Sequence, residues 1–218
     1  MFSLLLCLAG RGAMALYDVK PDEIPGKPGS IVRIWPLEGG GAGVVGKGNA
    51  FRVLYRSTGL NGEPIAVSGA IFIPAGAAPA GGRNVIAWAH PTSGVMPPCA
   101  PSLMPDTAGL IWGLGAMLAN GYVVTATDYP GLGTDGIHPY LIGESEGRAV
   151  LDSVRAARDL PDAHASNRFA VWGHSQGGHA SLYTGELAAS YAPDLKLVGV
   201  AAAAPATYLI ELFDADKS

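Results

Sequence analysis

The residues with the most distinctive chemistry are Gly173-His174-Ser175-Gln176-Gly177. They fit G-x-S-x-G, the nucleophile elbow, in which a serine sits on a tight strand-to-helix turn with its hydroxyl exposed. A serine presented in this way can attack a carbonyl carbon and form an acyl-enzyme. The glycines are needed because the turn places the serine in a sparsely populated backbone conformation and brings strand and helix close together.

The flanking residues favour an elbow over a chance match. Residues 168–172 predict a short buried strand, and residues 178–183 begin a helical pattern. The alternative is a loop that spells the pattern by chance in a chain with 31 glycines. An elbow serine also needs a histidine base and an acid, which follow it in chain order. The only histidine after Ser175 is His179, so the sequence contains a nucleophile without an evident base.

Two backbone N–H groups hold the oxyanion in an elbow enzyme. One belongs to the residue after the nucleophile, which is Gln176. The other comes from the loop after an earlier strand, and a predicted strand ends at Ala89. Pro91 has no N–H, so Thr92 is the candidate for the second donor, with Ser93 next. The alternative is an ordinary turn that ends the strand.

Asp128 also follows a predicted strand, and loops at the carboxyl ends of strands build the sites of open α/β sheets. It can be interpreted as the catalytic acid or as a residue that stabilises its own turn. The second interpretation is preferred because the acid of an elbow enzyme follows the nucleophile in the chain.

The five histidines are given structural roles. His174 is expected to pack beside the site, and His179 shares one rigid helix with the serine and cannot readily reach its hydroxyl. His90 and His138 are expected to form hydrogen bonds around the site, and His164 to lie in solvent. No pair has metal-ligand spacing, so neither a metal nor a cofactor is predicted.

Composition excludes several classes of protein. Of the 218 residues, 49% are hydrophobic and 15% are charged, which is typical of a globular chain and not of a disordered one. The formal net charge is −4 and Lys and Arg do not cluster, so nucleic acid is not an expected partner. No apolar run reaches the roughly 18 residues needed to span a bilayer.

The N-terminus resembles a secretion signal. Residues 2–9 form a short apolar core, and Ala13-Met14-Ala15 match a small-x-small cleavage site. We therefore expect a signal peptide over residues 1–15 of a secreted or periplasmic protein; the alternative is a buried first strand or helix. Without these residues Cys99 is the only cysteine, which indicates a free thiol, a missing partner or a buried inert side chain.

The rest of the chain divides into an N-terminal arm and a core. Residues 16–49 hold many Pro and Gly residues and predict an arm or linker with a glycine-rich loop, in which residues 31–36 form a strand. Residues 50–218 are the predicted core. There, residues 50–57 and 65–73 alternate at period two around Asn61-Gly62, which predicts an antiparallel hairpin.

Four short apolar runs follow the hairpin, and they predict central parallel strands buried on both faces. They are residues 84–89, 122–127, 169–172 and 197–202. Helical patterns over residues 107–120, 144–160 and 175–191 separate them. The alternation predicts an α/β fold with a mixed, mostly parallel sheet and flanking helices.

Five segments together resemble the secretory lipase family of α/β-hydrolases. They are residues 88–94, 99–102, 127–134, 138–141 and 173–178, which occur in the family's order and cover most of residues 50–205. The resemblance implies hydrolysis of carboxylic esters, including triacylglycerols, by Ser175 as nucleophile. It also implies an oxyanion hole formed by Gln176 and Thr92.

The resemblance further implies where the missing partners lie. In the family a lid, the Asp and the His follow the strand that corresponds to residues 197–204. We therefore expect a chain that lacks the C-terminal strands, lid and triad partners, with the usual disulfide partner of Cys99 among them, and that is nearly inactive as given. Bacterial members usually have glycine where Pro91 stands, and proline would stiffen the oxyanion loop. The expected partners are small-molecule or lipid esters and a lipid–water interface.

Two alternatives remain open. An acyltransferase or peptidase can use the same scaffold, because the fold does not determine the acyl acceptor. A non-catalytic binding module would also explain a chain with no evident base.

Overall fold

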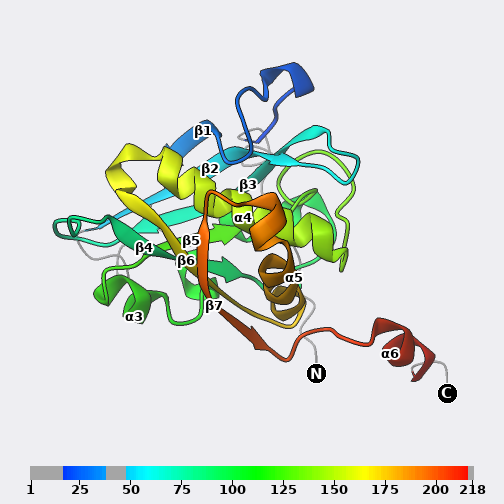
Figure 1. The fold of residues 1–218 in the computed structure, drawn as a ribbon. Helices are drawn as coiled ribbons and strands as arrows, with labels where there is room; N and C mark the ends of the chain where they lie inside the picture. The colour runs from blue at the N-terminus through cyan, green and yellow to red at the C-terminus, as the bar shows by residue number, and fades with distance from the viewer. Residues whose placement is uncertain (1–16, 38–47, 216–218) are drawn as a thin grey trace.

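The computed structural model describes residues 17–37 and 48–215. The predicted signal peptide, residues 1–15, and most of the glycine-rich loop lie outside these ranges and stay predictions. The described residues form one seven-stranded sheet with helices against its faces (Figure 1).

The sheet begins with three antiparallel strands, which are β1 (Ile31–Pro36), β2 (Asn49–Thr58) and β3 (Pro64–Ile73). β2 and β3 pair along their whole lengths across a turn in which Gly62 has a φ of 85°. This backbone conformation costs glycine little, which explains why the Asn61-Gly62 pair closes the turn. The predicted hairpin is confirmed.

Four further strands complete the sheet, and they are β4 (Arg83–Ala89), β5 (Val123–Thr127), β6 (Ala165–His174) and β7 (Lys196–Ala203). The strand order is β1-β2-β3-β5-β4-β6-β7. β5 is antiparallel to β3, whereas β4 is parallel to both β5 and β6, and β6 is parallel to β7. The predicted mixed α/β sheet is confirmed, and the carboxyl ends of β4, β5 and β6 lie at one edge.

Two long helices cover one face of the sheet, and they are α4 (Gly143–Asp159) and α5 (Gln176–Tyr191) (Figure 1). Val150 and Val154 of α4 share a buried cluster with Phe169 and Val171 of β6. The short helix α3 (Leu114–Ala119) lies on the other face, where Leu114 packs in a second cluster with residues of β4 and β5. Apolar residues on both faces of the central strands explain their nearly continuous apolar sequences.

The helix predicted over residues 107–120 is shorter than expected. Residues Ala108–Leu110 form a 3-10 turn, and α3 starts only after Gly113, whose φ is 79°. The hydroxyl of Thr107 donates to the carbonyl oxygen of Met104, 3.0 Å away. A local side-chain bond of this kind competes with the backbone hydrogen bonds of a helix. A glycine in the left-handed conformation also interrupts a helix.

The segment after residue 16 packs on the core over the described residues 17–37. Tyr17 and Ile24 are buried in a cluster with Leu103 and Leu132. Cys99 in the same cluster is disulfide-bonded, so all three interpretations are wrong: the free thiol, the inert side chain and the cysteine whose disulfide partner is missing from the chain. The chain's other cysteine, Cys7, lies outside the described residues. The remaining short turns are Pro21–Glu23, Pro97–Cys99, Pro101–Leu103 and Pro161–Ala163.

One strand is less buried than the sequence predicts. β7 is the last strand of the sheet, and Val198 and Val200 are 50% and 41% exposed. The expectation of burial on both faces is therefore wrong for residues 197–202, because an edge strand has a neighbour on one side only. The helix α6 (Leu209–Ala215) follows at the end of an extended segment and lies apart from the sheet (Figure 1).

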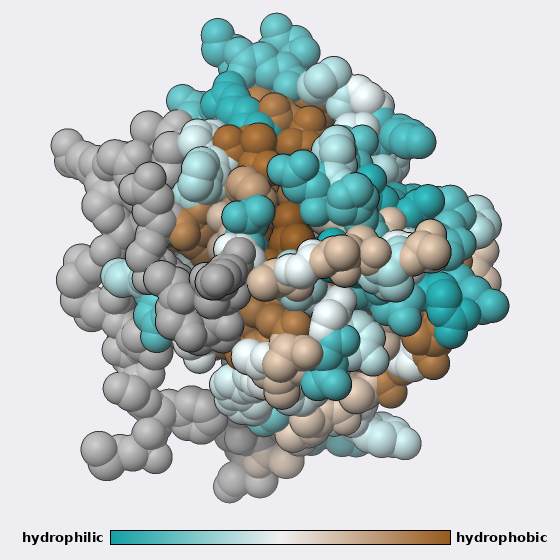
Figure 2. All heavy atoms as spheres, turned by 90° about the vertical axis from the view of Figure 1, so that its left-hand side faces the viewer, coloured by the Kyte–Doolittle hydropathy of each residue, from teal (hydrophilic) through white to brown (hydrophobic). Residues whose placement is uncertain are grey.

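On the face that Figure 2 shows, hydrophobic residues gather in the middle, and hydrophilic residues lie above them and to their right. Among residues 17–37 and 48–215, no helix has the length and apolar character needed to cross a membrane.

Candidate active site

The predicted elbow forms between β6 and α5. β6 ends at His174, and Ser175 is the N-cap residue of α5, with φ 56° and ψ −118°. Residues other than glycine rarely adopt a positive φ, and strain of this kind clusters at functional sites. The strand, turn and helix predicted around the serine are confirmed.

Three glycines allow the turn to close. A Cβ at Gly173 would collide with the carbonyl oxygen of Gly177, and a Cβ at Gly177 would collide with that of Ala89. A Cβ at Gly178 would lie 2.7 Å from the carbonyl oxygen of Ala203. Because β4 and β7 approach the turn this closely, only glycine fits at these positions.

Backbone hydrogen bonds hold Ser175 on both sides. Its N–H donates to the carbonyl oxygen of Ala203 over 3.0 Å, and its own carbonyl accepts from the N–H of His179 over 3.0 Å. The residue is half-buried. Its hydroxyl makes no hydrogen bond to any described residue, so it is available to a substrate and to a base.

The loop after β4 leaves the sheet beside the elbow, because Ala89 pairs with Gly173 across parallel strands. Thr92 on this loop is exposed, and its Oγ1 lies 3.0 Å from the hydroxyl of Tyr140. Its backbone N–H has no hydrogen-bond acceptor among the described residues. Gln176 is the first helical residue of α5, where an N–H has no partner inside the helix. Both predicted donors thus lie at neighbouring strand ends with free N–H groups.

The Gln176 side chain is buried in a polar network. Its Nε2 donates to Oε1 of Glu146 over 2.8 Å and lies 3.1 Å from Nε2 of His138. A side-chain amide nitrogen is only a donor, so His138 Nε2 is the acceptor. The proton of His138 is then on Nδ1, which donates to the carbonyl oxygen of Pro130 over 2.8 Å. Burial lowers the pKa of His138, which favours this neutral ring.

An apolar cavity of about 460 Å³ opens beside the same loop. Its lining includes Thr92, Met104, Leu110 and Trp112. The Trp112 ring also contacts the ring of His174, with 4.9 Å between centroids. The prediction that His174 packs beside the site is confirmed, and this contact connects the cavity to the elbow.

The remaining histidines do not supply a base in the described chain. His179 Nδ1 lies 2.8 Å from Oε2 of Glu146, and no hydrogen bond joins its ring to the Ser175 hydroxyl. The buried ring of His90 lies within hydrogen-bond distance of the carbonyl oxygens of Pro91 and Asp128. It therefore connects the loop after β4 to the end of β5. His164 is exposed, as predicted.

Asp128 is fully buried and faces two serines, not a histidine. Its carboxylate accepts hydrogen bonds from Ser68 Oγ at 2.7 Å and from the N–H of Ser102 at 2.8 Å. Burial raises its pKa to about 6, although the hydrogen bonds from Ser102 and Ser68 lower it. It connects β3 and the turn at residues 101–103 to the end of β5, so its role is broader than stabilising its own turn.

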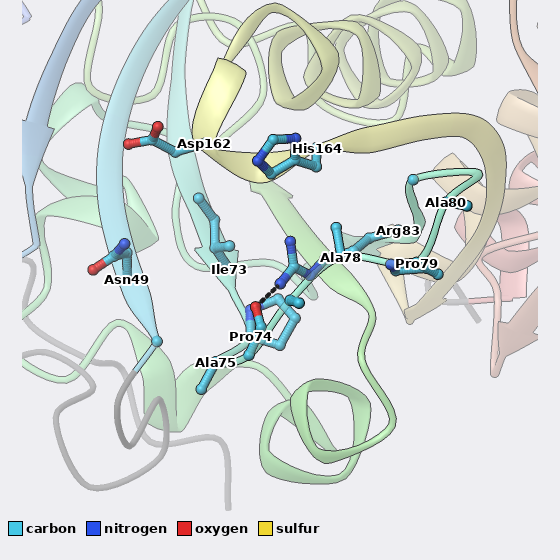
Figure 3. A pocket seen from close by; sticks show the side chains of 14 residues that line it. Asn49, Ile73, Pro74, Ala75, Ala78, Pro79, Ala80, Arg83, Asp162 and His164 are labelled. Atoms are coloured by element: carbon cyan, nitrogen blue, oxygen red, sulfur yellow. Dashed lines mark hydrogen bonds between the residues drawn. The ribbon is translucent and has the colours of Figure 1, made fainter.

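A second cavity lies at the opposite end of the parallel strands. It has about 680 Å³ and is lined by residues 73–80, Arg83, Asp162 and His164 (Figure 3). Arg83, the first residue of β4, donates to the carbonyl oxygen of Gly76 over 2.5 Å, as the dashed line shows. This cavity is remote from the elbow, because Ser175 follows the carboxyl end of β6.

The described residues contain no group of three His, Cys, Asp or Glu side chains that could hold a metal ion. Two residues beside the elbow, Glu146 and Trp112, were missed by the sequence analysis. Glu146 lies three residues before Ala149 and four before Val150, so it is on the same apolar face of the helix. An acidic residue on an apolar face is unusual, and this was the signal in the sequence that could have identified it. No comparable signal in the sequence marks Trp112, because this residue lies in an irregular segment between a 3-10 turn and α3, where no periodic pattern applies.

Comparisons with known proteins identify a family and several relatives. The model of the family "Secretory lipase" matches residues 110–217. The chain is 29% identical to lipase A of Moesziomyces aphidis over 161 residues, which are 69% of the chain and 34% of the relative. It is 28% identical to a probable inactive lipase of Mycobacterium tuberculosis, over 82% of the chain and 42% of that relative.

A solved structure is similar over most of the chain. The closed state of Candida antarctica lipase A superimposes with a TM-score of 0.67 and 25% identity, over 80% of this chain and 41% of that one. The chain spans between 34% and 42% of the two curated relatives. It therefore aligns with less than half of each of these proteins.

Proposed function

Because the chain belongs to the secretory lipase family and has the α/β-hydrolase fold, we propose that it carries the nucleophile and oxyanion hole of a serine ester hydrolase. The observation that supports this most is the strained backbone of Ser175 at the elbow. Secretion belongs to the proposal, on the grounds of the family and of the apolar residues 2–9.

The proposed reaction is acyl transfer. Ser175 Oγ attacks the ester carbonyl carbon, and the N–H groups of Gln176 and Thr92 bind the oxygen as it becomes negative. A histidine base takes the hydroxyl proton and gives it to the departing alcohol. Water then attacks the acyl-serine and releases the carboxylic acid.

The base is the component that the described residues do not supply. We propose that it and its acid belong to the part of a full-length relative that this chain does not span. Without them an oxyanion hole alone retains on the order of 10³–10⁴-fold catalysis over water.

The apolar cavity beside Thr92 supports an ester with a hydrocarbon acyl chain as the substrate. Its walls contribute Met104, Leu110 and Trp112, which suit an alkyl group and not a charged one. A lipid ester at a lipid–water interface is the proposed natural substrate.

The test is ester turnover by the protein expressed from its complete reading frame. Ser175→Ala should abolish hydrolysis of p-nitrophenyl butyrate, because no other group replaces the nucleophile. Ser190→Ala, at an exposed position near the end of α5, is the matched control and should keep full activity.

Two outcomes would contradict the proposal. Most of the activity surviving in Ser175→Ala would show that another residue is the nucleophile. No turnover by the wild-type protein from the complete frame would favour the alternative of a non-catalytic module.

A further inference from the structure

Glu146 has no role in the proposed reaction, yet its side chain is fully buried beside the elbow. A buried carboxylate loses its hydration, and that cost is offset only by charge partners or hydrogen bonds. In the described ranges no Lys or Arg pairs with Glu146. Its stabilisation comes from N–H donors instead.

Three donors converge on this carboxylate. Oε1 accepts from Gln176 Nε2 over 2.8 Å and from the backbone N–H of Leu141 over 3.2 Å. Oε2 lies 2.8 Å from Nδ1 of His179. The donors come from the loop before α4 and from the first turn of α5, so one side chain connects the two segments.

Hydrogen bonds on both sides of the Gln176 backbone N–H set the direction in which it points. The peptide between Ser175 and Gln176 is held at its carbonyl oxygen, which accepts from the N–H of His179 over 3.0 Å. On the other side the buried Gln176 side chain is held by Glu146 and His138. The N–H of Gln176 therefore points out of the helix in one orientation.

The Leu141 bond extends this control to the second donor. Leu141 has a φ of 58°, an unfavourable conformation that its bond to Glu146 helps to maintain. One residue earlier, the Tyr140 hydroxyl lies 3.0 Å from Thr92 Oγ1. The loop that Glu146 holds thus contacts Thr92 through Tyr140 and Gln176 through His138.

We propose that Glu146 is a positioning residue that aligns both oxyanion donors, Gln176 and Thr92, through its bonds to the elbow helix and to the loop at residues 138–141. This inference rests on the proposed function, since it assigns a role within the same oxyanion hole. Small displacements of such donors cost large factors in rate, so the effect should appear in kcat.

The first experiment measures kcat and KM of the protein from its complete reading frame with p-nitrophenyl butyrate. Glu146→Gln keeps the shape but presents an amide to three donors, and should lower kcat roughly 10- to 100-fold with KM changed less than about twofold. Glu146→Asp keeps the charge on a shorter side chain and should recover part of the lost kcat.

Asp152 offers a matched control on the same helix. It is also fully buried and accepts hydrogen bonds from Ser57, Tyr191 and Arg155, none of which contacts the elbow. Asp152→Asn should lower Tm and leave kcat of the folded protein within about twofold. If Glu146→Gln lowers Tm in the same way with wild-type kcat, Glu146 is only structural and the inference is overturned.

A second measurement does not depend on turnover. Histidine-ring ¹⁵N NMR should show His138 protonated on Nδ1 with Nε2 as acceptor, as its contacts require. Glu146→Gln should shift the His138 Nε2 signal although Glu146 does not touch that ring. Unchanged His138 and Gln176 side-chain signals would contradict the network. Failure of the proposed function would appear separately, as activity retained by Ser175→Ala.

Discussion

The neighbouring strands β6 and β7 have similar apolar sequences and different environments. Val171 of β6 pairs with Val200 of β7, yet the first is 1% exposed and the second 41%. Leu197 packs against the core beneath the helices, whereas Val200 lines an open apolar groove with Trp112 and Trp172. Burial here depends on what covers a strand and on its place in the sheet, and not on the residue types in it.

The two strands also differ in how closely other backbone approaches them. At the end of β6 the elbow glycines contact carbonyl oxygens of β4 and β7. In β7 a Cβ at Gly199 would meet only the Cβ of Ala170, at 3.8 Å. We therefore expect the elbow to tolerate almost no added atoms and β7 to tolerate them well.

Glycine-to-alanine changes should show the largest difference. Gly177→Ala should lower the free energy of unfolding by roughly 3 kcal/mol or more, because the new Cβ collides with the Ala89 carbonyl oxygen. Gly199→Ala should change it by less than about 1 kcal/mol, since alanine loses less backbone entropy on folding. Urea unfolding followed by circular dichroism checks both. Equal effects would show that the elbow is looser than its contacts indicate.

The pH dependence of stability should differ between a carboxyl group in the interior, Asp128, and one in the turn before β7, Asp194. Burial raises the pKa of Asp128 to about 6, so its contribution to stability is complete below about pH 4 and is lost as the pH rises through about 6. The free energy of unfolding of the wild type, relative to Asp128→Asn, should fall by roughly 3 kcal/mol over this range.

Asp194 should behave in the opposite way. Its hydrogen bond from Arg155 holds the pKa of this carboxyl below its ordinary value, so its contribution is present near neutral pH and is lost on acidification. Because Asp194 is largely exposed, Asp194→Asn should cost less than about 1 kcal/mol at pH 7. Denaturant unfolding between pH 4 and 7 compares the two variants, and slopes of the same sign would contradict the assignment.

Substitution of the paired valines, Val171 and Val200, should also change the free energy of unfolding unequally, but by a smaller margin. Val171→Ala removes two buried methyl groups and should lower the free energy of unfolding by about 2 kcal/mol. Val200→Ala should cost less than about 1 kcal/mol. Thermal unfolding of the two variants checks this, and a large effect at Val200 would mean that β7 is covered in solution.

Much of the fold could be predicted because its signals are local. The alternation around Asn61-Gly62 predicted the hairpin, and strand, glycines and helix around Ser175 predicted the elbow. Each depends on residues a few positions apart. The helix over residues 107–120 was predicted too long because Thr107 bonds to Met104 and Gly113 adopts a positive φ, and neither effect is visible in apolar periodicity.

The candidate site was predictable only in part. Ser175, Gln176 and Thr92 were named from chain order and from the chemistry of an oxyanion hole, and they are still predictions as to role. Glu146 was missed because its partners come from two segments far apart in the chain, so an acid on an apolar stripe had no visible purpose.

The sequence by itself determined where the strands, the hairpin turn and the two long helices lie, because backbone preferences and apolar spacing act over a few residues. It also determined that Ser175 occupies a strained turn between a strand and a helix. Only the tertiary structure decided that the Asp128 carboxylate binds Ser68 and Ser102. It also decided that Glu146 connects the elbow helix α5 to the loop before α4. It also decided that β7 is exposed. These properties depend on which surfaces meet, since burial and hydrogen bonding between distant segments arise only when the sheet has been assembled.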